Sequence, residues 1–104
     1  MAVETMTYRL SRQADDDLRH IYVTGVEIFG VAQAEAYAAG LKRVLGFLAD
    51  FPRAARERRE LDPPVRAYPY KSHLIIYAIE HGGVLINRIV HSRQDWMNET
   101  RRIP

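Results

Sequence analysis

Two apolar stripes separated by a single glycine constrain the fold of this chain more than any other feature. Side chains spaced by threes and fours in this way form one buried face of an α-helix. The first stripe contains Ala14, Leu18, Ile21, Tyr22, Gly25, Ile28 and Phe29, and the second contains Ala34, Tyr37, Leu41, Val44, Leu45, Leu48 and Phe51. Because only Gly30 lies between them, we predict helices over residues 12–29 and 31–51 that run antiparallel with their apolar faces inward.

The sequence also marks where these helices begin and end. Ser11 can cap the first helix, and the three carboxylates at 15–17 lie near the positive end of its dipole, which favours a helix start over a cation site. Pro52 ends the second helix, because proline cannot continue the hydrogen-bond ladder. The charged segment 53–64 contains few apolar residues. We interpret it as an exposed connector that is partly helical at most.

Four other runs have the residue types and alternation of β-strands. These runs are Thr7–Leu10, Val65–Tyr70, His73–Glu80 and Val84–His91, and His81, Gly82 and Gly83 form a hairpin turn between the last two. The predicted fold class is α+β, with one domain over residues 1–104 and the helical hairpin on one face of a largely antiparallel four-stranded sheet. The predicted buried residues include Leu18, Tyr22, Leu41, Leu48, Ile76 and Ile86.

The apolar run 74–79 does not alternate, so both faces of its strand need cover. The helices can cover one face. We expect the other face, together with Leu85 and Ile89 on the next strand, to form an exposed apolar patch that a binding partner covers.

Composition limits where the protein works and what it binds. The chain has no cysteine, its longest apolar run is much shorter than the ~20 residues of a membrane span, and its start does not resemble a secretion leader, so we expect a cytoplasmic protein. Residues 1–51 carry five basic and seven acidic side chains, whereas residues 52–104 carry ten and six. This asymmetry favours an acidic partner, although scattered arginines can also simply keep a surface soluble.

Neither a metal nor another cofactor is expected. His20, His73, His81 and His91 are not spaced as metal ligands on one helix. Gly82 and Gly83 are not followed by a helix whose N-terminus could hold a phosphate.

Several fragments resemble one family when they are taken together and in order. They are Tyr8–Ser11 with Ala14, Asp17 and Leu18; Phe29 and Gly30 with Gln33, Ala34 and Tyr37; Phe51–Arg53; and Arg66, Tyr68, 73–77, Arg88–His91, Arg93 and Asp95. The chain resembles the ParE branch of the RelE/ParE toxin superfamily. The resemblance implies a small toxin that a cognate antitoxin neutralises by wrapping its C-terminal segment around it. It also implies that the free toxin inhibits DNA gyrase, while RelE members instead cut messenger RNA in the ribosome.

The residues favour the gyrase interpretation over the nuclease. Metal-free RNA cleavage needs an acid, a base and cations at the phosphate, and the tail after Arg93 offers no tyrosine and carries two carboxylates. Arg88 and His91 point to opposite faces of a regular strand unless a bulge intervenes. His91 can also be a strand-end histidine without a special role, and Arg88 a structural arginine paired with a helix acid.

We therefore expect no catalytic residue, no direct reading of nucleic-acid sequence and no membrane contact. The candidate residues for binding antitoxin or target are Arg66, Lys71, Leu85, Arg88, Ile89, His91 and Arg93. A ribosome-dependent mRNA interferase remains the alternative.

Overall fold

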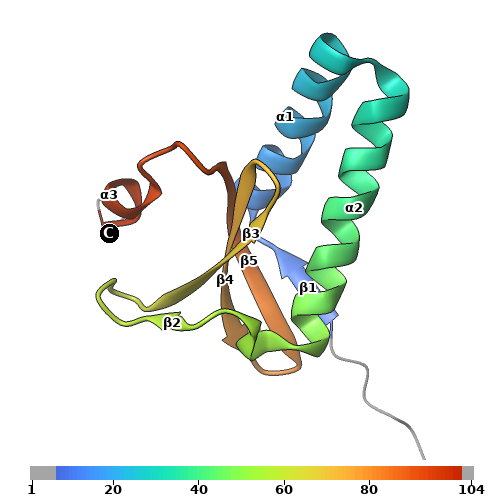
Figure 1. Ribbon diagram of the computed structural model, residues 1–104. Helices are drawn as coiled ribbons and strands as arrows, with labels where there is room; N and C mark the ends of the chain where they lie inside the picture. The colour runs from blue at the N-terminus through green and yellow to red at the C-terminus, as the bar shows by residue number, and fades with distance from the viewer. Residues whose placement is uncertain (1–6, 102–104) are drawn as a thin grey trace, which may run out of the picture.

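The computed structural model describes the backbone of residues 7–101 and the side chains of residues 7–98 (Figure 1). The helices are α1 (Arg12–Phe29), α2 (Val31–Asp50), the short 3-10 helix η1 (Pro52–Ala54) and α3 (Trp96–Arg101). The strands are β1 (Thr7–Leu10), β2 (Glu57–Arg58), β3 (Val65–Tyr70), β4 (His73–Glu80) and β5 (Gly83–His91).

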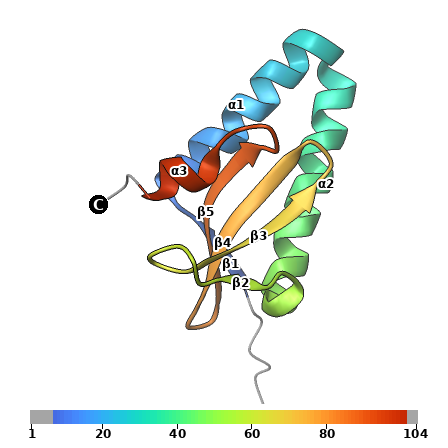
Figure 2. The same ribbon diagram turned by 60° about the vertical axis from the view of Figure 1, so that its left-hand side comes forward.

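The strands form one sheet in the order β1-β5-β4-β3-β2. β1 pairs with β5 in parallel, and the other pairs are antiparallel. The hairpin of α1 and α2 lies on one side of the sheet and α3 on the other (Figures 1 and 2). The α+β class and the largely antiparallel sheet are confirmed.

The sheet has five strands, one more than predicted. The additional strand is β2, whose Glu57 and Arg58 pair with Arg66 and Val65 of β3. It lies in the segment that we interpreted as an exposed connector, and Leu61 of the same segment is buried. A strand of two residues is too short to show an alternating pattern, so periodicity does not predict it.

The predicted helical hairpin is confirmed, and α2 ends one residue earlier than expected. The hydroxyl of Ser11 accepts a hydrogen bond of 2.9 Å from the backbone N–H of Ala14, as an N-cap does. Gly30 joins the helices with a φ of +92°, a conformation that residues with a Cβ rarely adopt.

The core between the hairpin and the sheet contains Leu41, Leu48 and Ile86 as predicted. Leu18 and Tyr22 are only half-buried, whereas Ile28 and Phe29 are 64% and 61% exposed. The reason is that the outer half of the hairpin extends past the end of the sheet (Figure 1). The first apolar stripe is therefore not buried over its whole length, and Phe51 at the end of the second is also exposed.

The far face of the sheet is covered in part by the chain itself. A second buried cluster contains Leu61, Val65, Ile76, Val90 and Trp96. Trp96 of α3 and Leu61 of the segment before β3 cover part of this face, and the expectation that a partner covers the rest around Leu85 stays a prediction. Ile89 belongs to the core on the helix side.

Candidate functional site

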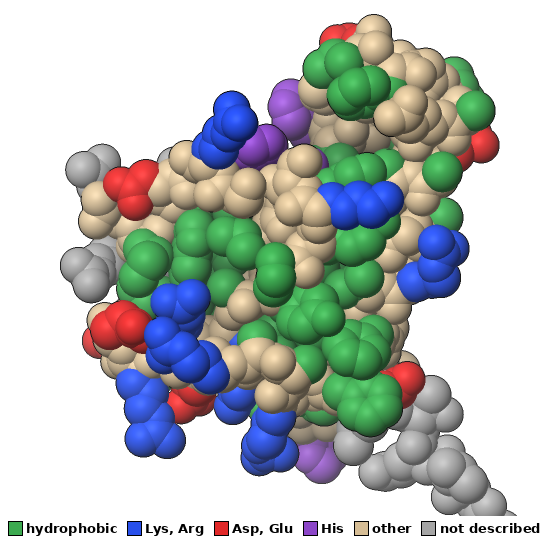
Figure 3. Space-filling model, viewed as in Figure 1, with side chains coloured by type: hydrophobic (Ala, Val, Ile, Leu, Met, Phe, Trp, Pro, Cys, Tyr) green, Lys and Arg blue, Asp and Glu red, His purple; other side chains and the backbone are tan. Residues whose placement is uncertain are grey.

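A cleft of about 810 Å³ opens between the outer half of the hairpin and the end of the sheet at which β3 turns into β4 and β5 ends. Ile21, Ile28 and Phe29 of α1 and Ala34 of α2 give it apolar walls. The polar side chains that line it include Asp17, His20, Tyr37, Lys71, His73, Arg88 and His91. Figure 3 shows histidines where the tip of the hairpin overhangs the sheet.

A β-bulge in β5 shapes the floor of the cleft. Ile76 pairs with Arg88 and Tyr77 with Ile86, so Asn87 is an additional residue without an opposite partner. A bulge of this kind shifts the alternation of side chains by one residue. Arg88 directly follows the additional residue, and both Arg88 and His91 line the cleft.

Helix α1 holds this bulge in place. The hydroxyl of Ser11 donates a hydrogen bond of 2.7 Å to the carbonyl of Asn87. One carboxylate oxygen of Asp17 accepts hydrogen bonds from the backbone N–H of Ile89 at 2.9 Å and from Nε of Arg88 at 2.8 Å. Nη2 of Arg88 donates to the other oxygen at 3.1 Å, so the pair is bidentate. Arg88 is thus paired with a helix acid, as its structural interpretation predicted.

Tyr37, His73 and His91 form a chain of contacts across the cleft. The hydroxyl of Tyr37 lies 2.7 Å from Nδ1 of His73, and which of the two groups donates depends on the histidine tautomer. The rings of His73 and His91 meet edge to face at 5.5 Å. Nδ1 of His91 accepts a hydrogen bond from the backbone N–H of Arg93 at 3.1 Å.

Burial adjusts the protonation of this chain of contacts. The pKa of His73 is lowered by its burial and then by the charge of His91. Burial raises the pKa of Tyr37. Both groups are consequently neutral at pH 7, which suits the hydrogen bond between them.

Lys71 supplies a positive charge at the mouth of the cleft. It forms the tight turn between β3 and β4 with a φ of +50°, and its ammonium lies 5.5 Å from the centre of the Tyr70 ring and 5.7 Å from that of Tyr37. The only carboxylate among the described residues that line the cleft is Asp17, which Arg88 neutralises. The cleft is therefore positive and partly apolar.

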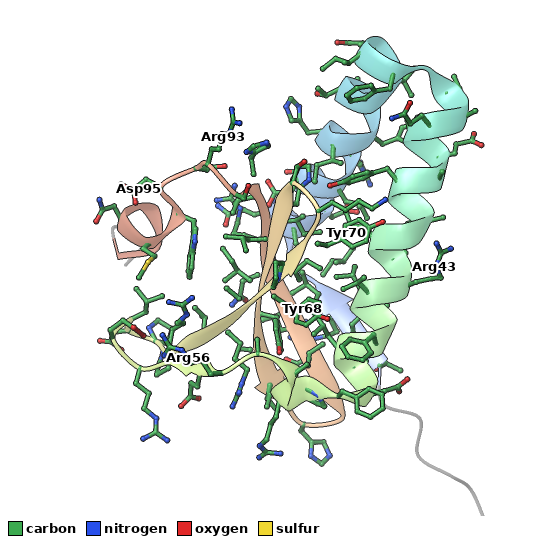
Figure 4. The ribbon with its side chains drawn as sticks, in the orientation of Figure 1. Arg43, Arg56, Tyr68, Tyr70, Arg93 and Asp95 are labelled. Carbon is green, nitrogen blue, oxygen red and sulfur yellow. The ribbon has the colours of Figure 1, made fainter. Side chains whose placement is uncertain are left out.

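The structure divides the residues singled out from the sequence. Lys71, Arg88, Ile89 and His91 line the cleft. Arg93 lies just beyond it and points outward from the segment after β5 (Figure 4).

Arg66 and Leu85 lie elsewhere. Arg66 donates a hydrogen bond of 2.6 Å to the carbonyl of Ala55, and half-buried Leu85 pairs with Arg9 and Ala78 in the middle of the sheet. The predicted set is therefore not one site. Tyr37 and His73 are cleft residues that the prediction did not include.

Among the residues that the structure describes, no group of three or more His, Asp or Glu side chains is placed to hold a metal ion. None of the helices described here is long and apolar enough to cross a membrane.

A family model described as "ParE toxin of type II toxin-antitoxin system, parDE" matches residues 8–96. The chain belongs to the ParE toxin family. This match shows that it is the toxin of a type II toxin-antitoxin system of the ParDE kind. The matched range contains every residue that lines the cleft of this ParE toxin, from Asp17 of α1 to Gln94 after β5.

Individual relatives agree with the family. Toxin ParE1 of Mycobacterium tuberculosis is 32% identical over 89 residues, which cover 85% of this chain and 91% of that protein. Toxin ParE3 of Caulobacter vibrioides is 29% identical over 85 residues, with 82% and 85% covered. A chain from the structure titled "Chromosomal ParDE TA system from P. aeruginosa" has the same fold, with a TM-score of 0.72, 20% identity and coverage of 86% and 98%.

Proposed function

We propose that a cognate antitoxin neutralises this ParE toxin by placing a segment with apolar and acidic residues in the cleft. The observation that carries the proposal is the combination of exposed apolar walls with an excess of positive charge. Ile28 and Phe29 are mostly exposed at one wall, and Lys71 lies at the mouth. Apolar anchors from a partner would bury these walls, while its carboxylates would meet the cation and speed association.

The two lysines of this chain allow a matched test. Lys71 lines the cleft, whereas Lys42 is exposed on α2 outside it. Against the antitoxin encoded in the adjacent reading frame, Lys71→Glu is expected to weaken binding by about tenfold or more, and Lys42→Glu to leave it nearly unchanged. Equal affinities for both variants, measured by calorimetry, would place the antitoxin elsewhere.

Hydrogen exchange of the toxin with and without antitoxin locates the contact directly. Protection is expected at both cleft walls, on the outer half of the hairpin and on residues 71–73 and 88–91. Protection on the helices with none on residues 65–93 would contradict this placement of the antitoxin.

We further propose that the free toxin inhibits DNA gyrase in the cytoplasm by protein contact, without chemistry of its own. Membership of the ParE family supports this. The pairing of Arg88 with Asp17 also supports it. A nuclease would use such a guanidinium to bind the phosphate of its substrate, whereas here the guanidinium binds a carboxylate of the same chain. Purified toxin is expected to inhibit supercoiling by gyrase and to accumulate cleaved DNA. A toxin that leaves both reactions unchanged would contradict it.

One observation favours a second candidate function, ribosome-dependent cleavage of messenger RNA. The cleft brings together three side chains that can exchange protons and one cation, which are Tyr37, His73, His91 and Lys71. If the protein acts on gyrase, His91→Gln keeps toxicity within a few-fold. Loss of toxicity by orders of magnitude in a folded His91→Gln variant, together with messenger cleavage by the unmodified toxin in a translation reaction, would favour the nuclease.

A further inference from the structure

The outer face of α2 carries exposed side chains that neither the core nor the cleft uses. Ala36, Ala39, Arg43, Phe47 and Asp50 are spaced by threes and fours and are all exposed. In Figure 4, Arg43 points away from the sheet, and in Figure 3 hydrophobic side chains gather beside the lower half of α2. This outer face is therefore an unpartnered helix surface.

An aromatic patch lies at the centre and lower end of this face. Phe47 is 40% exposed and Phe51 is 59% exposed, and their ring centres are 5.1 Å apart. Phe47 also contacts Tyr68 of β3, with ring centres 5.7 Å apart, so its orientation is fixed. Aromatic side chains, phenylalanine included, are enriched in the buried core of protein interfaces.

The patch is separate from the antitoxin cleft. The last residue of α2 that lines the cleft is Tyr37, and Phe47 follows ten residues later. At 1.5 Å per residue this places it roughly 15 Å further along the helix. A segment that fills the cleft would leave Phe47 and Phe51 uncovered there.

The charged residues on the outer face of one copy could pair with those on the outer face of a second copy. Arg43 and Asp50 lie at equal distances on either side of the peptide that joins Gly46 to Phe47. They are roughly 10 Å apart along the helix, too far to pair with each other. In the part of the chain described here, neither takes part in an ion pair. A second α2 that crosses antiparallel at this point would bring each Arg43 opposite the Asp50 of the other copy.

We propose that two copies of this chain associate through the outer face of α2, antiparallel and about a two-fold axis near Phe47. The two Phe47 rings meet at the centre, flanked by two pairs of Arg43 and Asp50. A Cβ at Gly46 would meet no other atom within 4 Å, so the helices can approach closely there. One helix face per copy makes a small interface, which suits a dissociation constant on the order of 10–100 µM.

Charge reversal tests this geometry, because a two-fold interface has a distinctive response. Arg43→Asp places two acids opposite each other, and Asp50→Arg places two bases, so each variant alone is expected to sediment as a monomer. A mixture of the two variants restores both pairs and is expected to form a heterodimer. The double variant with both changes is expected to dimerise like the unmodified chain. Sedimentation velocity over a concentration series measures all four.

The control is Lys42→Glu, which changes the charge by the same amount beside the outer face and is expected to leave dimerisation intact. Recovery of the heterodimer in the mixture shows that each variant is folded. An unmodified chain that stays monomeric throughout the series overturns the proposal. A dimer that neither charge reversal weakens also overturns it, because another surface then forms the contact. If the unmodified chain is monomeric and Phe47→Ser lowers its affinity for the antitoxin, the outer face of α2 binds the antitoxin and not a second copy.

Discussion

Tyr37 and His73, which are 36 residues apart in the sequence, share a hydrogen bond of 2.7 Å that ties α2 to the start of β4. A neutral imidazole can make this bond in either tautomer, as acceptor or as donor at Nδ1. Burial and the neighbouring His91 favour the same neutral form.

This bond predicts that the free energy of unfolding depends on pH. His73 has a folded pKa below its ordinary value of 6.5, so the unfolded chain binds more protons between these two values. The contribution of His73 to the free energy of unfolding is fully present above the pKa that His73 has in the unfolded chain. It is lost as the pH falls through the lower pKa that His73 has in the folded chain. Urea unfolding at about pH 7.5 and about pH 5.5 is expected to show this loss, and His73→Asn, which keeps an acceptor, to reduce it. An unchanged pH dependence in His73→Asn would contradict the assignment.

Leu41 tests the phase of α2. It is fully buried between the hairpin and the sheet. Leu41→Ala is expected to lower the free energy of unfolding by about 2 to 5 kcal/mol, because it leaves a cavity in the core. Ala39→Ser, on the exposed outer face, is the control and should change the unfolding midpoint little. Similar midpoints for both variants would mean that the helix phase is wrong.

The pair of Asp17 and Arg88 is expected to matter more than the surface pair of Arg9 and Glu80. Side-chain exposure is only 17% and 25% in the first pair, and the carboxylate also holds the backbone of the bulge. Asp17→Asn is therefore expected to cost about 2 to 4 kcal/mol, because the guanidinium is left without its counter-charge. Glu80→Gln at the exposed pair should cost far less. Equal losses in chemical denaturation would show that the bulge does not depend on α1.

Two glycines of α2 are expected to respond oppositely to alanine. A Cβ at Gly46 meets open space, so Gly46→Ala is expected to stabilise the helix by about 0.5 to 1 kcal/mol. A Cβ at Gly40 would overlap the hydroxyl of Tyr70 and displace a ring that Lys71 and Tyr37 both contact. Gly40→Ala should therefore gain nothing and should shift the NMR signals of Tyr37 and Tyr70. Equal stabilisation by both variants in dilute solution would contradict this packing.

The sequence predicted the regular elements because their signals are local. The stripes around Gly30 predicted both long helices, and the residue types of β3 to β5 predicted three strands. The bulge at Asn87 could not be predicted, because it is held by a contact with Ser11, which is 76 residues away in the sequence. It reversed the side chains that follow it and so moved Ile89 to the helix side.

The candidate site was predicted only in part for a similar reason. Lys71 and Arg88 were recognised as cations, but Tyr37 was counted only as an apolar residue of its helix stripe. Its hydrogen bond to His73 depends on how far α2 extends beside the turn between β3 and β4. The position of α2 relative to this turn is set by the packing of the helix against the sheet. It cannot be predicted from the spacing of residues within α2 alone.

The parallel pairing of β1 with β5 has a consequence for how the toxin is made. Thr7 pairs with Gly83, and the carbonyl of Thr7 packs where a side chain of residue 83 would lie. β1 is therefore synthesised long before β5, the strand with which it pairs. At about 5 to 20 residues per second, synthesis separates the two strands by several seconds. Until β5 has been synthesised, β1 has no strand to pair with in the sheet, and the cleft lacks the floor that β5 provides. The floor of the cleft is therefore among the last parts of the sheet to be synthesised.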